Sequence, residues 1–420
     1  MIGDYKRFDM KLTPLRQQHY LRPITWGVSI LATLRHKAII RRFGMEGVKP
    51  PYLLLCNHNS FLDFKVMTAA IFPRRANYVV AIDGFIKRKW LMRLVGCICT
   101  RKFTNDLMLV KNMLHVVQQG DIVVLYPEAR YSLCGTNAVL PASLGKLVKR
   151  MDVPVVTLIM HGHHVNSPFW NTKDRAVKPI EAELKLLYTP EQIRELTVNE
   201  INEGLDQAFQ YDDFRWQKER GIHINYPHRA KGLHKVLYQC PHCLTEYEMD
   251  SKGDTLWCNY CGKKWTMSTL GELKAEEGET EFSHIPDWYE WERDNVRKEI
   301  EAGTYYFRSE VIVHSLPDAK GFIDFGTATL VHDMKGFLLT GSHNSTPYEL
   351  TWKPQALYSC HIEYDYRKLG DCVDLNTNND TLYIYPQTKK FSVTKLSLAT
   401  EELYKMTQMQ WRSSIRRNHL

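Results

Sequence analysis

The fold class is limited above all by a pattern that repeats between residues 49 and 160, in which a short apolar run ends in a polar cluster and a helical segment follows. Apolar runs of this length predict buried strands. Strands that alternate with helices predict an α/β domain with a mainly parallel sheet. The expected strands cover residues 52–56, 78–82, 96–100, 121–126 and 153–160.

Polar clusters follow these strands at their carboxyl ends, the edge at which open α/β sheets bind ligands. Loops are polar in any protein, so a single cluster would mean little, but several with reactive side chains predict one shared site. The three imidazoles in residues 161–164 fit a metal or phosphate site, or simply a packed polar loop, and the sequence leaves that choice open. The side chains concerned are His58, Arg101, Glu128, Arg130, His161, His163 and His164.

The first cluster, Asn-His-Asn-Ser-Phe-Leu-Asp at residues 57–63, has a spacing with a structural meaning. Inside one α-helix, two residues five apart are about 140° apart around the axis and do not share a face. His58 is therefore predicted to lie in the turn before a helix, with Asp63 in the first helical turn. A neutral imidazole whose tautomer is fixed by a carboxylate can take a proton from a hydroxyl. The alternative is a structural turn, in which Ser60 caps the helix and Asp63 is an ordinary acid of its first turn.

This cluster resembles the NHxSxxD block of the glycerolipid acyltransferases, of the 1-acylglycerol-3-phosphate acyltransferase type. Further segments are similar to the family's later blocks and occur in the same order: Gly-Cys-Ile-Cys-Thr-Arg at 96–101, Tyr-Pro-Glu-Ala-Arg-Tyr-Ser at 126–132 and Val-Pro-Val-Val at 153–156. The first and third blocks are specific in combination, whereas the other two are weak alone. The resemblance covers residues 15–210, which is close to half of the chain.

The resemblance implies acyl transfer from a thioester, either acyl-CoA or an acyl-carrier protein, to a hydroxyl of glycerol phosphate or a lysophospholipid. In that reaction His58 deprotonates the hydroxyl and Asp63 orients His58. Guanidinium groups suit the acceptor's phosphate. The resemblance assigns acceptor binding to Arg101, Glu128 and Arg130.

The third block departs from the family pattern in one position. The family's arginine usually follows the glutamate by three positions, whereas Arg130 follows Glu128 by two and Tyr131 takes the expected place. The departure leaves the acceptor's identity open. For Glu128, the alternative is a buried carboxylate that pairs with an arginine for structure.

Two Cys-x2-Cys pairs separated by 14 residues form a second strong signal. This spacing predicts a zinc ribbon at residues 236–268, with a hairpin near 251–254 and a tetrahedral Zn²⁺ held by four thiolates. Because protein fills all four positions, the zinc is expected to be structural; a redox pair is the alternative. The other six cysteines lie mostly in or beside apolar stretches, which predicts a reducing, cytoplasmic setting. The predicted ligands are Cys240, Cys243, Cys258 and Cys261.

The first 50 residues carry ten lysines and arginines against three acids, together with an uncharged run at 23–34. This run is shorter than the roughly 20 apolar residues that cross a bilayer. Residues 1–45 are therefore predicted to be a basic amphipathic segment that lies on the inner face of a membrane, which makes the protein a peripheral one. An amphipathic helix packed on the domain is the alternative. No recognition module accompanies the charge, which argues against nucleic acid as a partner.

The rest of the chain divides into an α/β domain at 46–225, a helical linker at 269–302 and a β-rich region at 303–420 that ends in a helix. The last region resembles a PH-like or GRAM-like domain by the order of its elements. Such a domain and the ribbon both suit a protein partner. A non-catalytic adaptor with an acyltransferase-like fold is the rival to the enzyme.

Overall fold

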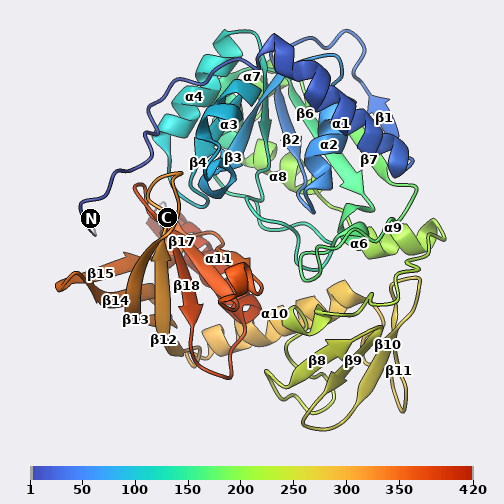
Figure 1. The fold of residues 1–420 in the computed structure, drawn as a ribbon, viewed down its shortest axis with the longest axis vertical. Coiled ribbons are helices and arrows are strands. Elements are labelled where there is room, and N and C mark those ends of the chain that lie inside the picture. Colours follow the sequence, from blue (N-terminus) through green and yellow to red (C-terminus); the bar gives the residue numbers. More distant parts are fainter. Residues whose placement is uncertain (1–2, 419–420) are drawn as a thin grey trace.

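The computed structural model describes residues 3–418, with side chains described as far as Gln408. Residues 1–2 and 419–420, at the outer ends of the predicted segments 1–45 and 303–420, lie outside the described residues. Three sheets divide the chain: an α/β body, a small four-stranded sheet, and a β domain closed by the C-terminal helix (Figure 1). The β domain and the small sheet both lie below the α/β body in Figure 1, and α10 (Ile285–Glu301) runs between them.

The first sheet has seven strands in the order β1-β7-β6-β2-β5-β3-β4. All its strand pairs are parallel except β6 with β7, so the predicted mainly parallel α/β sheet is confirmed. The strands are β1 (Ile39–Phe43), β2 (Leu53–Cys56), β3 (Ala76–Ala81), β4 (Cys97–Thr100), β5 (Ile122–Leu125), β6 (Val155–His161) and β7 (Glu181–Tyr188). The helices around it are α1 (Arg22–Arg35), α2 (Leu62–Ala70), α3 (Lys89–Val95), α4 (Leu107–Gln118), α5 (Leu144–Met151), α6 (His163–Asn166), α7 (Pro190–Glu195), α8 (Val198–Ala208) and α9 (Asp213–Glu219).

Strand β2 lies at the centre of the sheet, between β5 and β6, and every one of its residues is buried. A strand covered on both faces needs a continuous apolar run, and Leu-Leu-Leu-Cys supplies one. Its carboxyl end therefore delivers the turn at 57–61 to the middle of the ligand-binding edge.

Two strands of this sheet were not expected from the sequence. β1 is an edge strand with the sequence Ile-Ile-Arg-Arg-Phe, and it pairs in parallel with β7, Ile39 opposite Glu181. Arg41 donates a 2.7 Å hydrogen bond to Glu181 on that neighbour. Charged side chains on a half-exposed edge break the apolar run that identifies a strand. The sheet thus begins before residue 46, where the sequence placed the start of the domain.

The second sheet contains the two cysteine pairs and has the order β11-β10-β9-β8. The predicted hairpin is confirmed: β8 and β9 join through Gly253, whose φ of +62° suits glycine. β11 lies inside the predicted helical linker, so only 285–301 of that segment is helical. The indole of Trp288 on α10 packs against Trp265, with 5.0 Å between ring centroids. The strands are β8 (Met249–Lys252), β9 (Thr255–Cys258), β10 (Lys264–Met267) and β11 (Leu273–Ala275).

The third sheet is antiparallel throughout, in the order β15-β14-β13-β12-β18-β17-β16, and α11 (Val393–Asn418) follows it. Its alternation of buried and exposed positions is clear in β12, which is the pattern of a strand with one face on a core. Residues 304–306 and 357–360 of the predicted β-rich region are irregular, and the strands that follow them begin at Phe307 and His361. The strands are β12 (Phe307–Ser315), β13 (Ile323–Asp333), β14 (Gly336–His343), β15 (Thr346–Trp352), β16 (His361–Glu363), β17 (Cys372–Asn376) and β18 (Thr381–Pro386).

Candidate functional site

The turn after β2 brings an imidazole and a carboxylate together. His58 Nδ1 lies 3.0 Å from Asp63 Oδ2, and Asp63 stands in the first turn of α2, where the sequence predicted it. The same oxygen accepts hydrogen bonds from the backbone N–H groups of Asn59 and Ser60, at 2.6 and 2.9 Å. Three donors thus fix a fully buried carboxylate. With Nδ1 directed at Asp63, the other ring nitrogen of His58 is left to face outward.

A second imidazole, from the 161–164 cluster that the sequence singled out without pairing it to Asp63, contacts the other oxygen of this carboxylate. His163 Nδ1 lies 2.6 Å from Asp63 Oδ1, and both side chains are buried. Burial by itself raises the pKa of Asp63, but the hydrogen bonds with His163 and His58 outweigh it and lower the pKa to about 2. Asp63 is therefore an anion at neutral pH.

The other two imidazoles of the 161–164 segment do not join this network. His161 stacks on Trp216, with 5.8 Å between ring centroids. His164 is buried against Trp170 and Phe214, and burial lowers its pKa to about 3. The three histidines therefore do not form one metal or phosphate site. The backbone of 162–164 is fixed by buried Asp213, which accepts from the N–H groups of Gly162 and His164.

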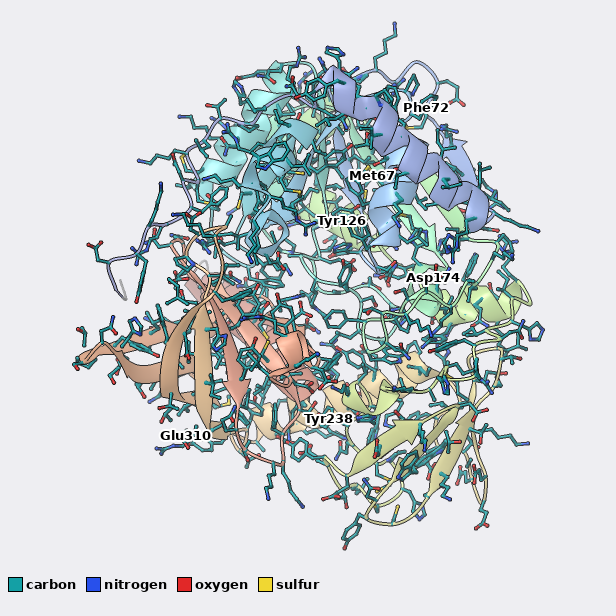
Figure 2. The ribbon with its side chains drawn as sticks, viewed as in Figure 1. Met67, Phe72, Tyr126, Asp174, Tyr238 and Glu310 are labelled. Carbon is teal, nitrogen blue, oxygen red and sulfur yellow. The ribbon has the colours of Figure 1, made fainter. Side chains whose placement is uncertain are left out.

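His58 lies at the surface of a pocket, with 24% of its side chain exposed. Its ring packs between Tyr126 and Tyr131, at centroid distances of 4.2 and 4.3 Å. Tyr126, labelled near the centre of Figure 2, lies deep in the molecule, at the junction of the α/β body and the parts below it. Among the described residues Nε2 of His58 has no hydrogen-bond partner, so it is open to a ligand.

Glu128 holds the backbone of His58. Its two oxygens accept from the N–H groups of His58, at 2.9 Å, and Ala138, at 2.7 Å. Burial raises the pKa of Glu128 to about 7, against the opposing effect of these two hydrogen bonds. The carbonyl of His58 in turn accepts from Ser132 N–H at 2.8 Å. The segment 126–132 thus positions His58 through its main chain, and Glu128 forms no ion pair with an arginine whose side chain is described.

The two predicted phosphate-binding arginines are bonded to the C-terminal domain, and each is only 3% exposed. Arg130 forms a 2.7 Å ion pair with Glu401 of α11. Arg101 donates to Thr381 Oγ1 and to three carbonyls, those of Leu316, Pro317 and Asn379. Their guanidinium groups join the α/β body to the β domain here, and their assignment to the acceptor remains a prediction.

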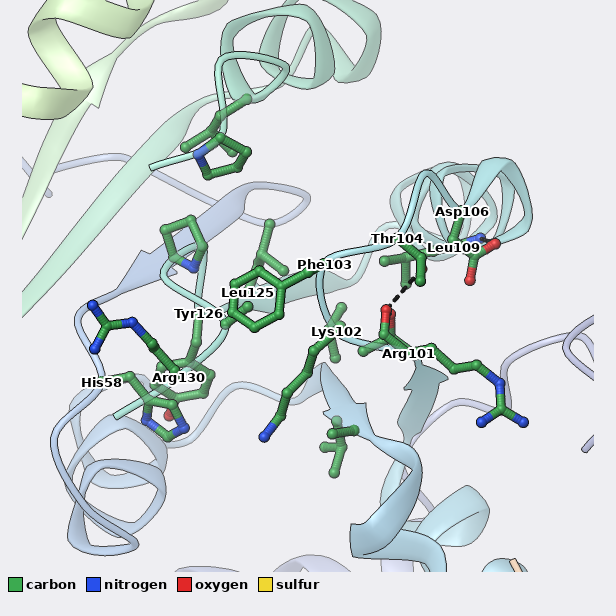
Figure 3. Close-up of a pocket in the computed structure, with 18 of the residues that line it drawn as sticks. His58, Arg101, Lys102, Phe103, Thr104, Asp106, Leu109, Leu125, Tyr126 and Arg130 are labelled. Atoms are coloured by element: carbon green, nitrogen blue, oxygen red, sulfur yellow. Dashed lines mark hydrogen bonds between the residues drawn. The ribbon is translucent and has the colours of Figure 1, made fainter. Parts of the chain in front are cut away.

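The pocket beside His58 has a volume of about 1840 Å³ and is lined by the carboxyl ends of β3, β4 and β5 together with parts of the β domain. Most of its walls are apolar, including Phe64, Leu91 and Met113. In Figure 3 Arg101 and Lys102 extend in opposite directions, and Lys102 points to the side on which His58 lies. Four basic side chains that line the pocket make no ion pair with any described residue: Arg88, Lys102, Lys146 and Arg150.

The four cysteines of the small sheet come together as the sequence predicted. Their sulfur atoms all lie within 4.8 Å of one another. A tetrahedral zinc with Zn–S bonds of about 2.3 Å requires sulfur atoms about 3.8 Å apart. The Sγ atoms of Cys240 and Cys261 are 3.8 Å apart, and those of Cys243 and Cys258 are 3.7 Å apart. The donor set therefore fits a zinc ion.

Helix α1 packs against α2 and directs a row of aliphatic side chains outward. Phe72, labelled in Figure 2, lies beside α1, where its ring contacts Trp26 at a centroid distance of 5.1 Å. Among the described residues, no helix combines the length and the apolar character that crossing a bilayer would take. The outward side chains are Ile24, Val28, Leu31 and Leu34, each at least half exposed.

Comparison with protein families matches residues 33–161 to the family described as Acyltransferase. This range runs from the end of α1 to the end of β6 and contains His58, Asp63 and Glu128. Among solved structures, the 1-acyl-sn-glycerophosphate (LPA) acyltransferase PlsC from Thermotoga maritima is similar, with 13% identity, coverage of 46% of this chain and 82% of that chain, and a TM-score of 0.34. Comparison with curated protein sequences gives no match.

Proposed function

The chain carries an acyltransferase-family domain at residues 33–161, and from this premise we propose that it transfers a fatty acyl group from acyl-CoA or an acyl-carrier protein to a hydroxyl of glycerol phosphate or a lysophospholipid. The observation that carries the proposal is the 3.0 Å contact between His58 and Asp63 at the wall of a large, mainly apolar pocket. An acyl chain requires apolar walls, and the acceptor hydroxyl requires a base.

The chemistry follows from the two nitrogens of His58. Asp63, an anion, accepts the Nδ1 proton and so leaves Nε2 as the base. Nε2 takes the proton of the acceptor hydroxyl as its oxygen attacks the thioester carbonyl. The tetrahedral intermediate collapses with loss of the C–S bond, and the imidazolium returns the proton to the departing thiolate. The negative charge of Asp63 stabilises the imidazolium between these two steps.

The unpaired basic side chains of the pocket support a role in binding the anionic part of the substrate. Lys102, the one of these four that Figure 3 labels, points toward the side on which His58 lies. In this proposal it contacts the acceptor's phosphate. Arg101 and Arg130 shape the pocket by joining it to the β domain, and Glu128 does so by holding the backbone of His58.

Substituting Lys102 by alanine is expected to raise KM for a phosphate-bearing acceptor about tenfold, the effect of losing about 1.4 kcal/mol of charge-assisted contact. The turnover number should change little, because the base and its carboxylate stay in place. Steady-state kinetics with a lysophospholipid measures both. Lys149→Ala, which removes a lysine of α5 outside the pocket, is the matched control. An unchanged KM would exclude Lys102 from the acceptor site.

The proposal includes a structural zinc ion at Cys240, Cys243, Cys258 and Cys261. Removing it with a chelator is expected to open residues 236–268 to proteolysis, because so small a sheet depends on its metal. Mass analysis of the fragments locates the cuts, and protection should return when Zn²⁺ is added back. Equal resistance to protease before and after metal removal would argue that the ribbon folds without the ion.

The proposal also places the protein on the inner face of a membrane, with α1 as the contact. Exposed aliphatic side chains on one helix face beside arginines are typical of helices that lie in the interface. Leu31→Asp combined with Leu34→Asp is expected to lower binding to anionic vesicles at least tenfold, and binding should weaken as salt rises. Sedimentation with vesicles measures it. These substitutions are preferable to deleting residues 1–45, which would remove β1 from the sheet.

Tyr306→Asp, which changes an exposed aromatic residue of the β domain, is the control for that experiment. If both variants bound vesicles equally well, α1 would not be the membrane contact.

A second candidate function is a non-catalytic adaptor that acts through its ribbon and its PH-like or GRAM-like β domain. The observation that favours it is the engagement of Arg101 and Arg130 by the C-terminal domain. Incubating the purified protein with labelled acyl-CoA and a panel of lysolipids distinguishes the two functions. Acyl transfer to any lysolipid supports the enzyme, and no transfer to any of them supports the adaptor.

A further inference from the structure

The β domain carries a second group of reactive side chains, on one face of the β16–β17 pair. These two strands are antiparallel, with His361 directly opposite Asp374. Side chains two residues apart on a strand point to the same face, so Glu363 joins His361 on that face. The register alone therefore brings one imidazole and two carboxylates together.

The three side chains approach within the reach of a single ion. His361 Nε2 lies 3.0 Å from Glu363 Oε1 and 3.9 Å from Asp374 Oδ2. One donor atom from each residue lies within 4.8 Å of the other two. His361 and Asp374 are each 3% exposed, whereas the Glu363 side chain is 19% exposed and leaves one side of the group open.

The group has no ion-paired cation among the described residues, although Lys102 lies near enough to oppose in part the rise that burial causes in the pKa of Asp374. The hydrogen bond found for the Asp374 carboxylate comes from the thiol of Cys372, at 3.6 Å, and is accepted by Oδ1. Oδ2 is left facing His361. Among the described residues, no lysine or arginine lies within ion-pair distance of Glu363 or Asp374. Two ionised carboxylates that share one imidazole in a largely buried setting are unfavourable, so the group takes up either a proton, as the raised pKa of Asp374 indicates, or a cation.

We propose that His361, Glu363 and Asp374 bind a divalent metal cation such as Mn²⁺ or Zn²⁺. One imidazole nitrogen and two carboxylate oxygens are ligands that these ions accept, and three protein ligands leave positions open for water or substrate oxygen. The open positions face the large pocket, because His361 and Glu363 line it. The site belongs to the β domain and not to the zinc ribbon.

The cation site is separate from the proposed base. A row of aromatic rings connects them: His58 contacts Tyr131 at 4.3 Å, Tyr131 contacts Phe169 at 5.7 Å, and Phe169 contacts His361 at 6.0 Å between ring centroids. A metal at His361 therefore does not touch the atoms that react at His58. Its binding is a property that can be tested without any acyl-transfer assay.

The test is a Mn²⁺ titration of the full-length protein with its ribbon zinc in place, followed by electron paramagnetic resonance of free Mn²⁺. Mn²⁺ prefers oxygen and nitrogen ligands, so it should not replace zinc on four thiolates. The expected result is one Mn²⁺ per chain, with affinity at least tenfold weaker in Asp374→Asn and in Glu363→Gln. Saturating Mn²⁺ should also raise the melting temperature of the wild type and not of either variant.

Glu349→Gln, a carboxylate-to-amide change at an exposed position of β15 in the same domain, is the matched control and should bind Mn²⁺ like the wild type. Glu363→Gln alters a partly exposed residue and is expected to fold, so Mn²⁺ binding can still be tested with this variant if Asp374→Asn does not fold. The proposal is overturned if the wild type binds neither Mn²⁺ nor any Zn²⁺ beyond the ribbon ion, or if both variants bind as tightly as the wild type.

Discussion

His58→Ala is expected to lower the turnover number for acyl transfer by roughly 10²–10⁴, the usual contribution of a positioned general base. The fold should persist, because the contacts that hold the turn are made by the His58 backbone and by Asp63, and both remain. Initial rates with acyl-CoA and a lysophospholipid, together with the melting temperature, measure the two effects separately. His223→Ala, at an exposed position that does not line the pocket, is the control.

The pH profile adds a discriminating measurement. The pKa of Asp63 is about 2, so this carboxylate stays ionised from neutral pH down to the lower end of any practical assay range. A fall in rate below neutral pH must then come from another group, and Glu128, whose pKa is about 7 and which fixes the backbone of His58, titrates in that range. If the activity of His58→Ala lay within a few-fold of the wild type, His58 would not be the catalytic base, and the non-catalytic adaptor would be the better proposal.

Glu401→Ala is expected to cost about 3–5 kcal/mol of the free energy of unfolding, the typical loss when one partner of a buried ion pair is removed. The carboxylate of Glu401 accepts 2.7 Å contacts from Arg130 and from Arg293, and both guanidinium groups are buried. Burial raises the pKa of Glu401, but the two arginines outweigh it and lower the pKa to about 2. Without Glu401, Arg130 is left in the interior without its ion-pair partner, whereas Arg293 keeps its contacts with Glu290 and Glu402.

Urea denaturation measures the loss. Arg194→Ala is the control, because its ion pair with Asp152 is exposed at the surface and should be worth less than about 1 kcal/mol. Acyl transfer by Glu401→Ala should also fall, since Arg130 lies two residues after Glu128, which fixes the backbone of His58. A cost as small as that of the control would show that the α/β body and the β domain do not depend on this ion pair.

Several features were predictable because they depend on residues close together in the chain. The strand at 53–56, the turn after it and the helix that begins at Leu62 follow from an apolar run and a polar cluster. β1 and β7 were not predicted, because an edge strand with arginines and a strand with alternating charges lack that apolar run. The residues 269–284 were predicted to be helical, but pairing with β10 makes a strand of 273–275.

The sequence by itself determined the parallel α/β body, the neighbourhood of His58 and Asp63, and the gathering of the four cysteines, because each rests on a short spacing that local geometry converts into a contact. The tertiary structure alone decided that His163, 100 residues away, holds Asp63 from behind. It also decided that Arg101 and Arg130 turn to the β domain and that His361 and Glu363 face the same pocket as His58. Those contacts depend on how distant segments pack and on the direction in which each side chain leaves its strand. Neither can be predicted from the spacing of residues along the chain.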